Sequence, residues 1–451
     1  MTRAGLRLPP RTPFSAGPGM LRDLVGDRLA MMTTAVDNHG DAVRMVAGPK
    51  TLYFFNHPDH AKRVLAENSE NYHKGIGQVH AKRALGDGLL TSEGDLWKAQ
   101  RRTMRPVFGH KRIAGQADIV AKEAAALVDR LRARADQGPV DVAAEATGLT
   151  LGVLGHTLLD TDLHAFDTLG GAFEAVQDQA MLDMVTMNGL PVWLPFPTQT
   201  RFRRARRELQ RIVGRLVRDR VPSDGADDAL SRVLADAASE PDPGARSRRV
   251  RDELVTLLLA GHETTASTLS WAFYLVDQNP GTAERLREEA VRVLGDRPPT
   301  YEDLHGLTYT TMVIQETMRL YPPVWILPRK SLADDEVGGY HVPAGSDVLI
   351  CPYTLHRRSG SWADPERFDP ERFDPDRRED RHRYAYIPFG AGPRVCVGSN
   401  LGMLEAVFVL ASVSRELRLT LAPGRRVVPE PMLSLRVRGG LPMTIRRVQD
   451  G

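Results

Sequence analysis

The sequence predicts a mainly α-helical protein with a small β-sheet region. Residues 250–279 carry apolar side chains on nearly all sides of a helix, which is typical of a helix buried through a core. Residues 41–46 and 51–55 are β-rich runs around Gly48-Pro49-Lys50 and predict a hairpin. No repeat, low-complexity segment or convincing linker interrupts the chain. We therefore expect one domain, residues 21–451, after a proline-rich segment, residues 1–20.

Composition narrows the class of protein. The 451 residues include 60 basic and 57 acidic side chains, a net charge of +3 that gives no reason to expect nucleic-acid binding. Two cysteines cannot form a disulfide framework, which favours a reducing, cytoplasmic location. Residues 1–20 hold four prolines and three arginines with no apolar run, so we expect neither a signal peptide nor a membrane anchor.

The remaining elements follow from local signals. Pro58 lies near the first position of an expected helix, and residues 71–92, rich in glycine, predict loop with short helical pieces. Residues 182–200 are apolar but broken by prolines, which predicts a loop. Residues 201–220 contain nine arginines and an apolar stripe from Leu209 to Val217, which favours a solvated amphipathic helix over a nucleic-acid site. Residues 241–244 predict another loop, and alternation in residues 429–447 predicts strands.

The segment from Phe389 to Gly398, FGAGPRVCVG, contains one of the two cysteines. A thiolate in apolar surroundings needs a cation and hydrogen bonds to stabilise it. Gly392 and Gly398 would let backbone N–H groups curl around the sulfur, and Arg394 adds a positive charge. A lone cysteine cannot build a zinc site, so the pattern indicates a single thiolate ligand to heme iron. A buried, inert cysteine in a glycine-rich turn is the alternative.

The same segment resembles the heme-binding signature of the cytochrome P450 family, Phe-x-x-Gly-x-Arg-x-Cys-x-Gly, at every specified position. The likeness is to the soluble bacterial members. It implies heme b as the cofactor, Cys396 as the ligand of its iron, and Phe389, Arg394 and Gly398 as neighbours of the heme. It also implies one mainly α-helical domain, with a small β-sheet region, folded around that heme.

Further residues match the family's heme contacts. Trp97 and Arg101 stand four residues apart and so share one helix face, where the family supports a heme propionate. Many soluble bacterial members have histidine where Trp97 stands. Arg329 has the family's offset for a propionate contact, and Arg394 would take the other propionate with Trp97 and Arg101. An ordinary packed tryptophan beside a solvated arginine is the alternative reading of the helical pair.

The long helix contains Ala260-Gly261-His262-Glu263-Thr264-Thr265 at its centre. The Thr264 hydroxyl can bond the Ala260 carbonyl and weaken the helical ladder, while Gly261 would keep that side open as a groove for dioxygen and water. The run resembles the family's oxygen-activation motif, which implies that Thr264 and Glu263 deliver protons. The alternative is an irregular helix tolerated by packing.

Another motif concerns buried charge. Glu316 and Arg319 lie three residues apart on an expected helix, and alone this pair is a weak signal. The resemblance joins them to Arg372 of Pro-Glu-Arg-Phe in a buried structural cluster that requires several mutual hydrogen bonds.

Weaker signals concern ligands and partners. The apolar loop around residues 190–196 suggests a mobile lid over an apolar channel, with simple surface packing as the alternative. Residues 100–112 are basic without acids, which fits either a solvated face or a docking patch for an acidic electron donor. The expected substrate-pocket residues are Ile76, Val79, Leu90, Ala260, Val324, Trp325, Met432 and Leu433.

Together these motifs predict a monomeric heme-thiolate monooxygenase that hydroxylates or epoxidises a lipophilic small molecule, such as a terpenoid or polyketide. Electrons would come from NAD(P)H through a separate ferredoxin or flavodoxin-type donor. A fatty-acid hydroxylase is the next hypothesis for the substrate. A heme-thiolate sensor without turnover, a heme-free structural protein, and peroxide-driven or coupling chemistry on the same heme are the remaining alternatives.

Overall fold

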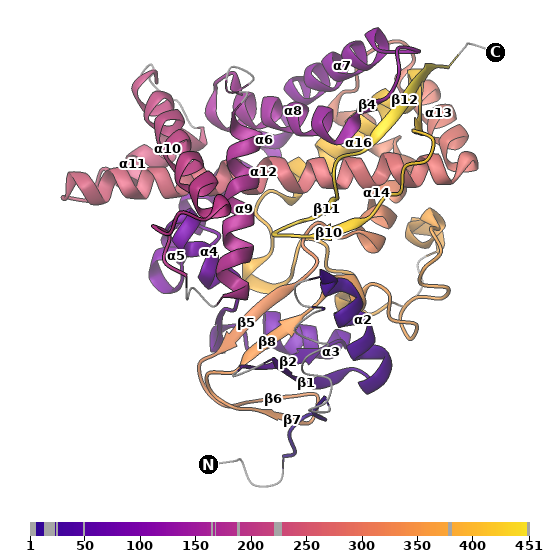
Figure 1. Ribbon diagram of the computed structural model, residues 1–451. Helices are drawn as coiled ribbons and strands as arrows, with labels where there is room; N and C mark the ends of the chain where they lie inside the picture. The colour runs from indigo at the N-terminus through magenta and orange to yellow at the C-terminus, as the bar shows by residue number, and fades with distance from the viewer. Residues whose placement is uncertain are drawn as a thin grey trace.

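The computed structural model describes residues 6–12, 23, 26–47, 50–163, 166, 168–186, 190–220, 228–377 and 381–448. Helices form the larger part of the molecule, and a β-rich part lies below them in Figure 1. The helices are α2 (Arg28–His39), α3 (Pro58–Lys62), α4 (Gln78–Leu85), α5 (Gly94–Met104), α6 (His110–Ala114), α7 (Ala117–Ala133), α8 (Val142–Leu154), α9 (Leu169–Val185), α10 (Pro197–Arg218), α11 (Ala229–Ala237), α12 (Pro243–Gln278), α13 (Pro280–Leu294), α14 (Thr308–Leu320), α15 (Pro352–Leu355) and α16 (Ser399–Glu416).

The β-rich part is built on a five-stranded sheet of order β1-β2-β8-β5-β3. The first two strands form the expected antiparallel hairpin, with Ala42 opposite Phe55, while Gly48 and Pro49 lie outside the described residues. Parallel pairing of β2 with β8 joins segments almost 300 residues apart. The strands are β1 (Ala42–Ala47), β2 (Lys50–Phe55), β3 (Tyr72–Lys74), β4 (Val140–Asp141), β5 (Leu327–Ser331), β6 (Asp335–Val337), β7 (Tyr340–Val342), β8 (Asp347–Ile350), β9 (Leu417–Leu421), β10 (Pro429–Pro431), β11 (Leu435–Val437) and β12 (Pro442–Arg447).

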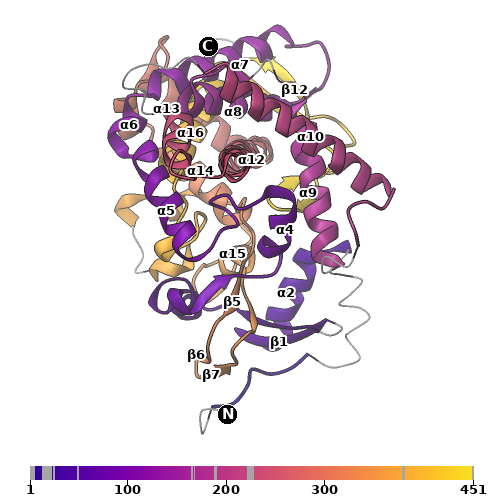
Figure 2. The ribbon, with the colours of Figure 1, turned by 90° about the vertical axis from the view of Figure 1, so that its left-hand side faces the viewer.

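Helix α12 is the central element of the helical part. Figure 2 views it end-on, with α5, α13, α14 and α16 on its left, α8 above it, and α9 and α10 on its right. Its 36 residues begin at Pro243, whose preceding Asp242 caps the helix by accepting from the N–H groups of Gly244 and Ala245. The expectation of a loop at residues 241–244 is therefore wrong in its second half, because Pro243 occupies the first turn, where a missing N–H costs nothing.

Two other boundaries differ from expectation. The segment expected as a loop, residues 182–200, includes the end of α9 and the start of α10, which begins at Pro197. Within α10, Leu209, Ile212, Val213 and Leu216 are buried as the stripe predicts.

The described part of the proline-rich segment lies against the β-rich part. The backbone of Arg7 forms an isolated parallel β-bridge with that of Tyr340, and the backbone of Arg11 forms another with that of Arg44. In the helical part, the window Val142–Leu159 is long and apolar enough to cross a membrane, and 67% of it is buried inside the protein.

Candidate active site

The cysteine loop is shaped by one glycine in particular. Gly392 has a φ of +70°, and a Cβ atom there would lie 1.9 Å from the carbonyl oxygen of Leu65. Only glycine permits both this conformation and this approach. The turn that follows brings the N–H of Cys396 to within 2.9 Å of the Phe389 carbonyl oxygen. Gly398 differs from expectation: its φ of −92° is open to other residues, and the Phe108 ring lies 3.4 Å from where a Cβ would stand.

Cys396 borders a hollow of about 470 Å³. The residue is set deep among protein atoms, yet its side chain is exposed to this space. Burial raises the pKa of the Cys396 thiol, whereas the Gly398 N–H and the positive charge of Arg101 act to lower it. A cation and an N–H donor therefore face the sulfur, as a thiolate requires. The hollow is lined also by Arg101, Arg105, Phe108, His110, Val397 and Asn400.

Two buried cations, Lys74 of β3 and Arg329 of β5, lie near Arg394 of the cysteine loop. Lys74 and Arg329 are 7% and 6% exposed, and Arg394 lies close enough to lower the pKa of both. Burial is the main cause, bringing the pKa of Lys74 to about 7 and that of Arg329 to about 10. No carboxylate of the described residues forms an ion pair with Arg329, whose Nη1 donates to its neighbour's carbonyl, Pro328 O. Such an excess of buried positive charge fits the propionate carboxylates of heme.

Arg394 has a partner that the sequence analysis missed. Its Nη1 lies 2.6 Å from Oε1 of Glu93, the residue before α5, and the same carboxylate accepts from the backbone N–H of Lys74. The Arg394 guanidinium lies 5.0 Å from the centroid of the Trp97 ring. Trp97 and Arg101 share one face of α5, as their spacing predicts, and both are half-buried. Nothing local marks Glu93, because its partners come from β3 and the cysteine loop.

The centre of α12 supports one expectation and corrects another. Thr264 Oγ1 donates to the Ala260 carbonyl oxygen at 2.9 Å, and Ala260 is exposed although it lies midway along the central helix. The helix nonetheless continues without a break from Pro243 to Gln278. Gly261 does not leave an open groove, because a Cβ atom there would lie 2.1 Å from Leu154 Cδ1 on α8. The glycine allows the two helices to approach closely.

Glu263 is held by residues from outside α12. Its Oε1 accepts a hydrogen bond of 2.6 Å from Ser434 Oγ, and the Gln177 side chain of α9 also bonds the carboxylate. Burial raises the pKa of Glu263, and both hydrogen bonds, together with the charge of Arg436, act to lower it. Neither Ser434 nor Gln177 could be predicted as a partner of Glu263 from the sequence.

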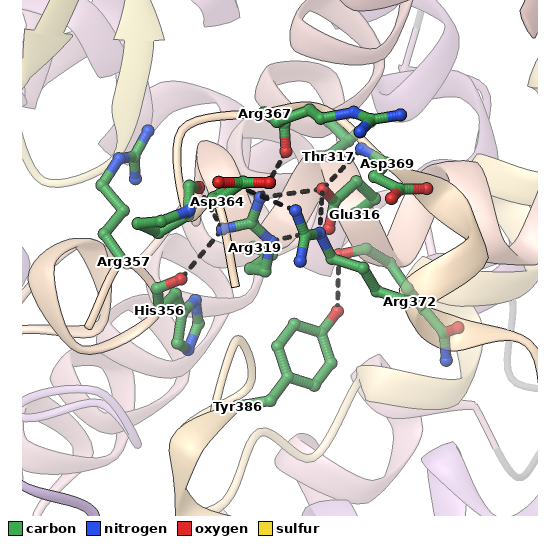
Figure 3. Close-up of polar contacts among 12 residues, drawn as sticks. Glu316, Thr317, Arg319, His356, Arg357, Asp364, Arg367, Asp369, Arg372 and Tyr386 are labelled. Atoms are coloured by element: carbon green, nitrogen blue, oxygen red, sulfur yellow. Dashed lines mark hydrogen bonds and ion pairs between the residues drawn. The ribbon is translucent and has the colours of Figure 1, made fainter. Parts of the chain in front are cut away.

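Glu316, Arg319 and Arg372 lie together, as Figure 3 shows. Arg319 donates from Nε and Nη2 to the two carboxylate oxygens of Glu316, at 2.6 and 2.8 Å, and both side chains are 0% exposed. Arg372 Nε lies 3.5 Å from Glu316 Oε1. The remaining Arg319 N–H groups donate to three carbonyl oxygens, those of His356, Pro365 and Arg367.

The expected pocket residues are placed unevenly. Trp325 is 4% exposed, and its indole N–H donates to the Met432 carbonyl, so almost none of its surface is available to a substrate. Met432 is half-buried, with its sulfur 3.9 Å from Arg28 Nη2. Val79 is 49% exposed on α4, while the others are half-buried, packed on apolar clusters: Ile76, Leu90, Val324 and Leu433.

The loop expected as a lid is tied down where it is described. Side chains of α4 and α10 donate to its carbonyls: Arg83 to Leu190, Gln199 to Pro191, and Arg203 to Trp193. Residues 187–189 lie outside the described residues.

Comparisons with known proteins agree with this geometry. The family model described as Cytochrome P450 matches residues 10–444. Cyclooctatin synthase of Streptomyces melanosporofaciens is 38% identical, over 88% of this chain and 87% of that protein. Cyclooctat-9-en-7-ol 5-monooxygenase of the same organism is 35% identical over 94% of each chain, and pentalenene oxygenase of Streptomyces avermitilis is 31% identical over 88% of each.

Proposed function

The chain belongs to the cytochrome P450 family and is a monooxygenase, and we propose that its substrate is a terpenoid secondary metabolite. The family match confirms the predicted fold class and reaction class. Two relatives carry names that specify oxidation of cyclooctat-9-en-7-ol and of pentalenene, and these names support the substrate class for this chain. Half-buried apolar residues of the expected pocket, Val324 and Leu433 among them, agree with a lipophilic molecule.

The observation that carries the reaction is the exposed thiol of Cys396 beside a hollow, in a loop that Gly392 shapes. Cys396 would ligate the heme iron, and the heme would supply the dioxygen-binding and oxygen-transfer chemistry. One oxygen atom enters a C–H or C=C bond of the substrate, and the other leaves as water after an electron pair and two protons are added. Arg329, Trp97 and Arg101 would hold the propionates, with Arg394 shared between this task and Glu93.

Thr264 and Glu263 are our candidates for proton delivery. The Thr264 hydroxyl is anchored on the Ala260 carbonyl, which leaves its oxygen available as an acceptor and orients it along the exposed side of α12. Glu263 is half-buried and burial raises its pKa, so it keeps its proton to a higher pH than an exposed carboxylate does. Glu263→Gln and Thr264→Ala should each lower the amount of product formed per NADPH consumed.

Family members of this kind take electrons from a separate redox partner, and we propose a ferredoxin-type donor that docks on the basic segment of residues 100–112. Arg102, Arg105 and Lys111 are exposed in this segment, and Arg105 also lines the hollow beside Cys396, so an acidic partner would be steered to the sulfur side. Arg105→Glu should slow reduction by a ferredoxin, with an effect that shrinks at high ionic strength. Arg246→Glu on the surface of α12 is the matched control, because it changes an exposed arginine by the same charge elsewhere.

A substrate-induced shift of the heme absorption band tests the substrate class. We expect the purified holoenzyme to shift with polycyclic terpenoid hydrocarbons or alcohols, in a saturable titration. A panel in which only fatty acids shift the band would overturn the terpenoid proposal in favour of a fatty-acid hydroxylase. Binding without NADPH-dependent product, in a complete redox system, would instead favour a ligand-binding sensor.

A further inference from the structure

The hairpin formed by β10 and β11 is fastened to one face of α12. Three α12 residues spaced four apart share that face: Glu263, Ser267 and Trp271. Ser267 Oγ and Trp271 Nε1 both donate to the carbonyl oxygen of Leu435, at 2.5 and 2.8 Å. The third residue, Glu263, accepts from Ser434. Two hairpin residues therefore meet three consecutive turns of the helix, which fixes the hairpin against the carboxyl group.

The turn of the hairpin is held from its other side as well. Trp325 Nε1 donates to the Met432 carbonyl oxygen at 2.9 Å, and Arg28 Nε donates to that of Pro431 at 3.0 Å. The backbone N–H of Leu435 donates to the Pro323 carbonyl oxygen at 2.8 Å. Ser434 itself is 2% exposed. Its hydroxyl has little freedom to move away from Glu263.

Arg436, on the same hairpin, is paired with acids of β10 and α9. It stands opposite Glu430 in the register of β10 and β11, and its Nε lies 2.7 Å from Glu430 Oε2. Its Nη2 lies 3.8 Å from Glu174 Oε1 on α9, a side chain that is 47% exposed. Arg201 of α10 pairs with the other oxygen of Glu174 at 3.3 Å. Arg436 is thus held by two acids, and its charge acts on Glu263 without an ion pair between the two side chains.

We propose that the β10–β11 hairpin positions the Glu263 carboxyl through Ser434 and favours its charged form through the nearby positive charge of Arg436. The inference rests on the proposed role of Glu263 in proton delivery and assigns to that acid its holding residue and the cation that acts on it. Ser434 and Arg436 are positioning residues, since they act through Glu263.

The sign of the effect follows from the groups that face Glu263. Burial raises its pKa, and the hydroxyl of Ser434, the charge of Arg436 and the amide of Gln177 each lower it. Removing Ser434 or Arg436 should therefore raise the pKa of Glu263 and shift the acid toward its neutral form. A hydrogen bond to a charged group is strong enough to move a pKa by about one unit, a tenfold change in proton affinity.

Infrared titration of the protonated carboxyl band in the resting holoenzyme measures this directly, without substrate or electron donor. Glu263→Gln assigns the band by abolishing it. We expect Ser434→Ala to shift its midpoint upward by about one unit, Ser434→Thr to restore it, and Arg436→Met to shift it in the same direction. Arg438→Met is the control: Arg438 is 53% exposed near the same strand and does not act on Glu263.

An unchanged midpoint in both Ser434→Ala and Arg436→Met would overturn the hairpin inference, whatever the enzyme oxidises. The proposed function fails separately, if Glu263→Gln leaves the yield of product per NADPH and its pH profile unchanged. In a supporting outcome, the pH profile of that yield moves with the infrared midpoint in Ser434→Ala. The shift should be absent when Ser434→Ala is combined with Glu263→Gln, which separates positioning of the acid from a general structural defect.

Discussion

Replacing Glu316 with glutamine would remove one charge from the most deeply buried ion pair described here. The substitution preserves the side-chain shape but leaves the Arg319 guanidinium without its counter-charge, where both side chains are 0% exposed. Removing one partner of a buried pair costs about 3–5 kcal/mol. Because Arg319 keeps three carbonyl acceptors, we expect Glu316→Gln to cost about 3 kcal/mol, near the lower limit of that range.

Arg372→Gln is the matched comparison within the same cluster. Arg372 Nε is 3.5 Å from Glu316, beyond a well-formed hydrogen bond, and its Nη2 donates once, to the Asp364 carbonyl at 3.0 Å. The loss should be about 1 kcal/mol, the net value of one hydrogen bond. Urea unfolding of both holoenzymes, followed by tryptophan fluorescence and heme absorption, measures the difference. Equal midpoints for the two variants would refute this account of the cluster.

A double variant separates the charge pair from the carbonyl contacts. Glu316→Gln with Arg319→Met removes both charges, which by itself often restores stability. Here it also leaves the carbonyls of His356, Pro365 and Arg367 without their donor, and each buried acceptor left unpaired costs about 1–3 kcal/mol. We therefore expect the double variant to be no more stable than Glu316→Gln. Recovery toward the parent protein would show that the pair, and not the carbonyl contacts, dominates.

The other predictions concern glycines and a buried histidine. Gly392→Ala should lower the free energy of unfolding by more than about 3 kcal/mol and reduce heme incorporation, because it adds a steric clash to a left-handed φ. Gly424 has a φ of +73° with open space around it, so Gly424→Ala should lower the free energy of unfolding by only about 1 kcal/mol in the same urea assay. Gly261→Ala should destabilise by about 1–3 kcal/mol through overpacking, and less so in a Leu154→Ala background, a coupling that a double-mutant cycle measures. Burial lowers the pKa of His262 from 6.5 to about 4, so between these pH values the unfolded chain binds a proton that the folded protein does not. The free energy of unfolding should therefore fall as the pH falls from 6.5 to about 4. His262→Phe should reduce this dependence, which urea unfolding midpoints at pH 7 and pH 5 measure.

Features that depend on short stretches of chain could be predicted from the sequence. The hairpin of β1 and β2, the start of α3 at Pro58 and the buried stripe of α10 each follow from periodicity or turn residues within one element. The boundary at Pro243 was missed because proline suits both a loop and the first turn of a helix. Only the Asp242 side chain, which accepts from the first N–H groups, separates these possibilities.

Features that depend on distant partners could not be predicted in detail. From the sequence, Gly261 predicts an open space beside the helix. In the structure its lack of a side chain makes room for Leu154, a residue of α8. The family resemblance brought Glu316 and Arg319 together with Arg372, yet it gave no sign of Glu93 or Ser434. Glu93 meets Arg394 across 301 residues, and Ser434 meets Glu263 across 171. Periodicity carries no information at such separations, since either acid would look the same on a solvated surface.

The buried arginines Arg319 and Arg329 differ in how completely the chain itself supplies partners for their charge. The hydrogen-bond donors of Arg319 are satisfied by the chain itself, which supplies a carboxylate and three carbonyl oxygens and leaves no place for a ligand. Arg329 is not fully satisfied by the chain. It is buried beside Lys74 and Arg394, burial lowers its pKa, and no carboxylate of the described residues forms an ion pair with it. The carboxylate of Glu93 acts on Arg329 without pairing with it, so an anion from outside the chain would stabilise this buried cation further. This contrast separates a structural arginine from a cofactor-binding one, and it cannot be recognised from the presence of an arginine in the sequence.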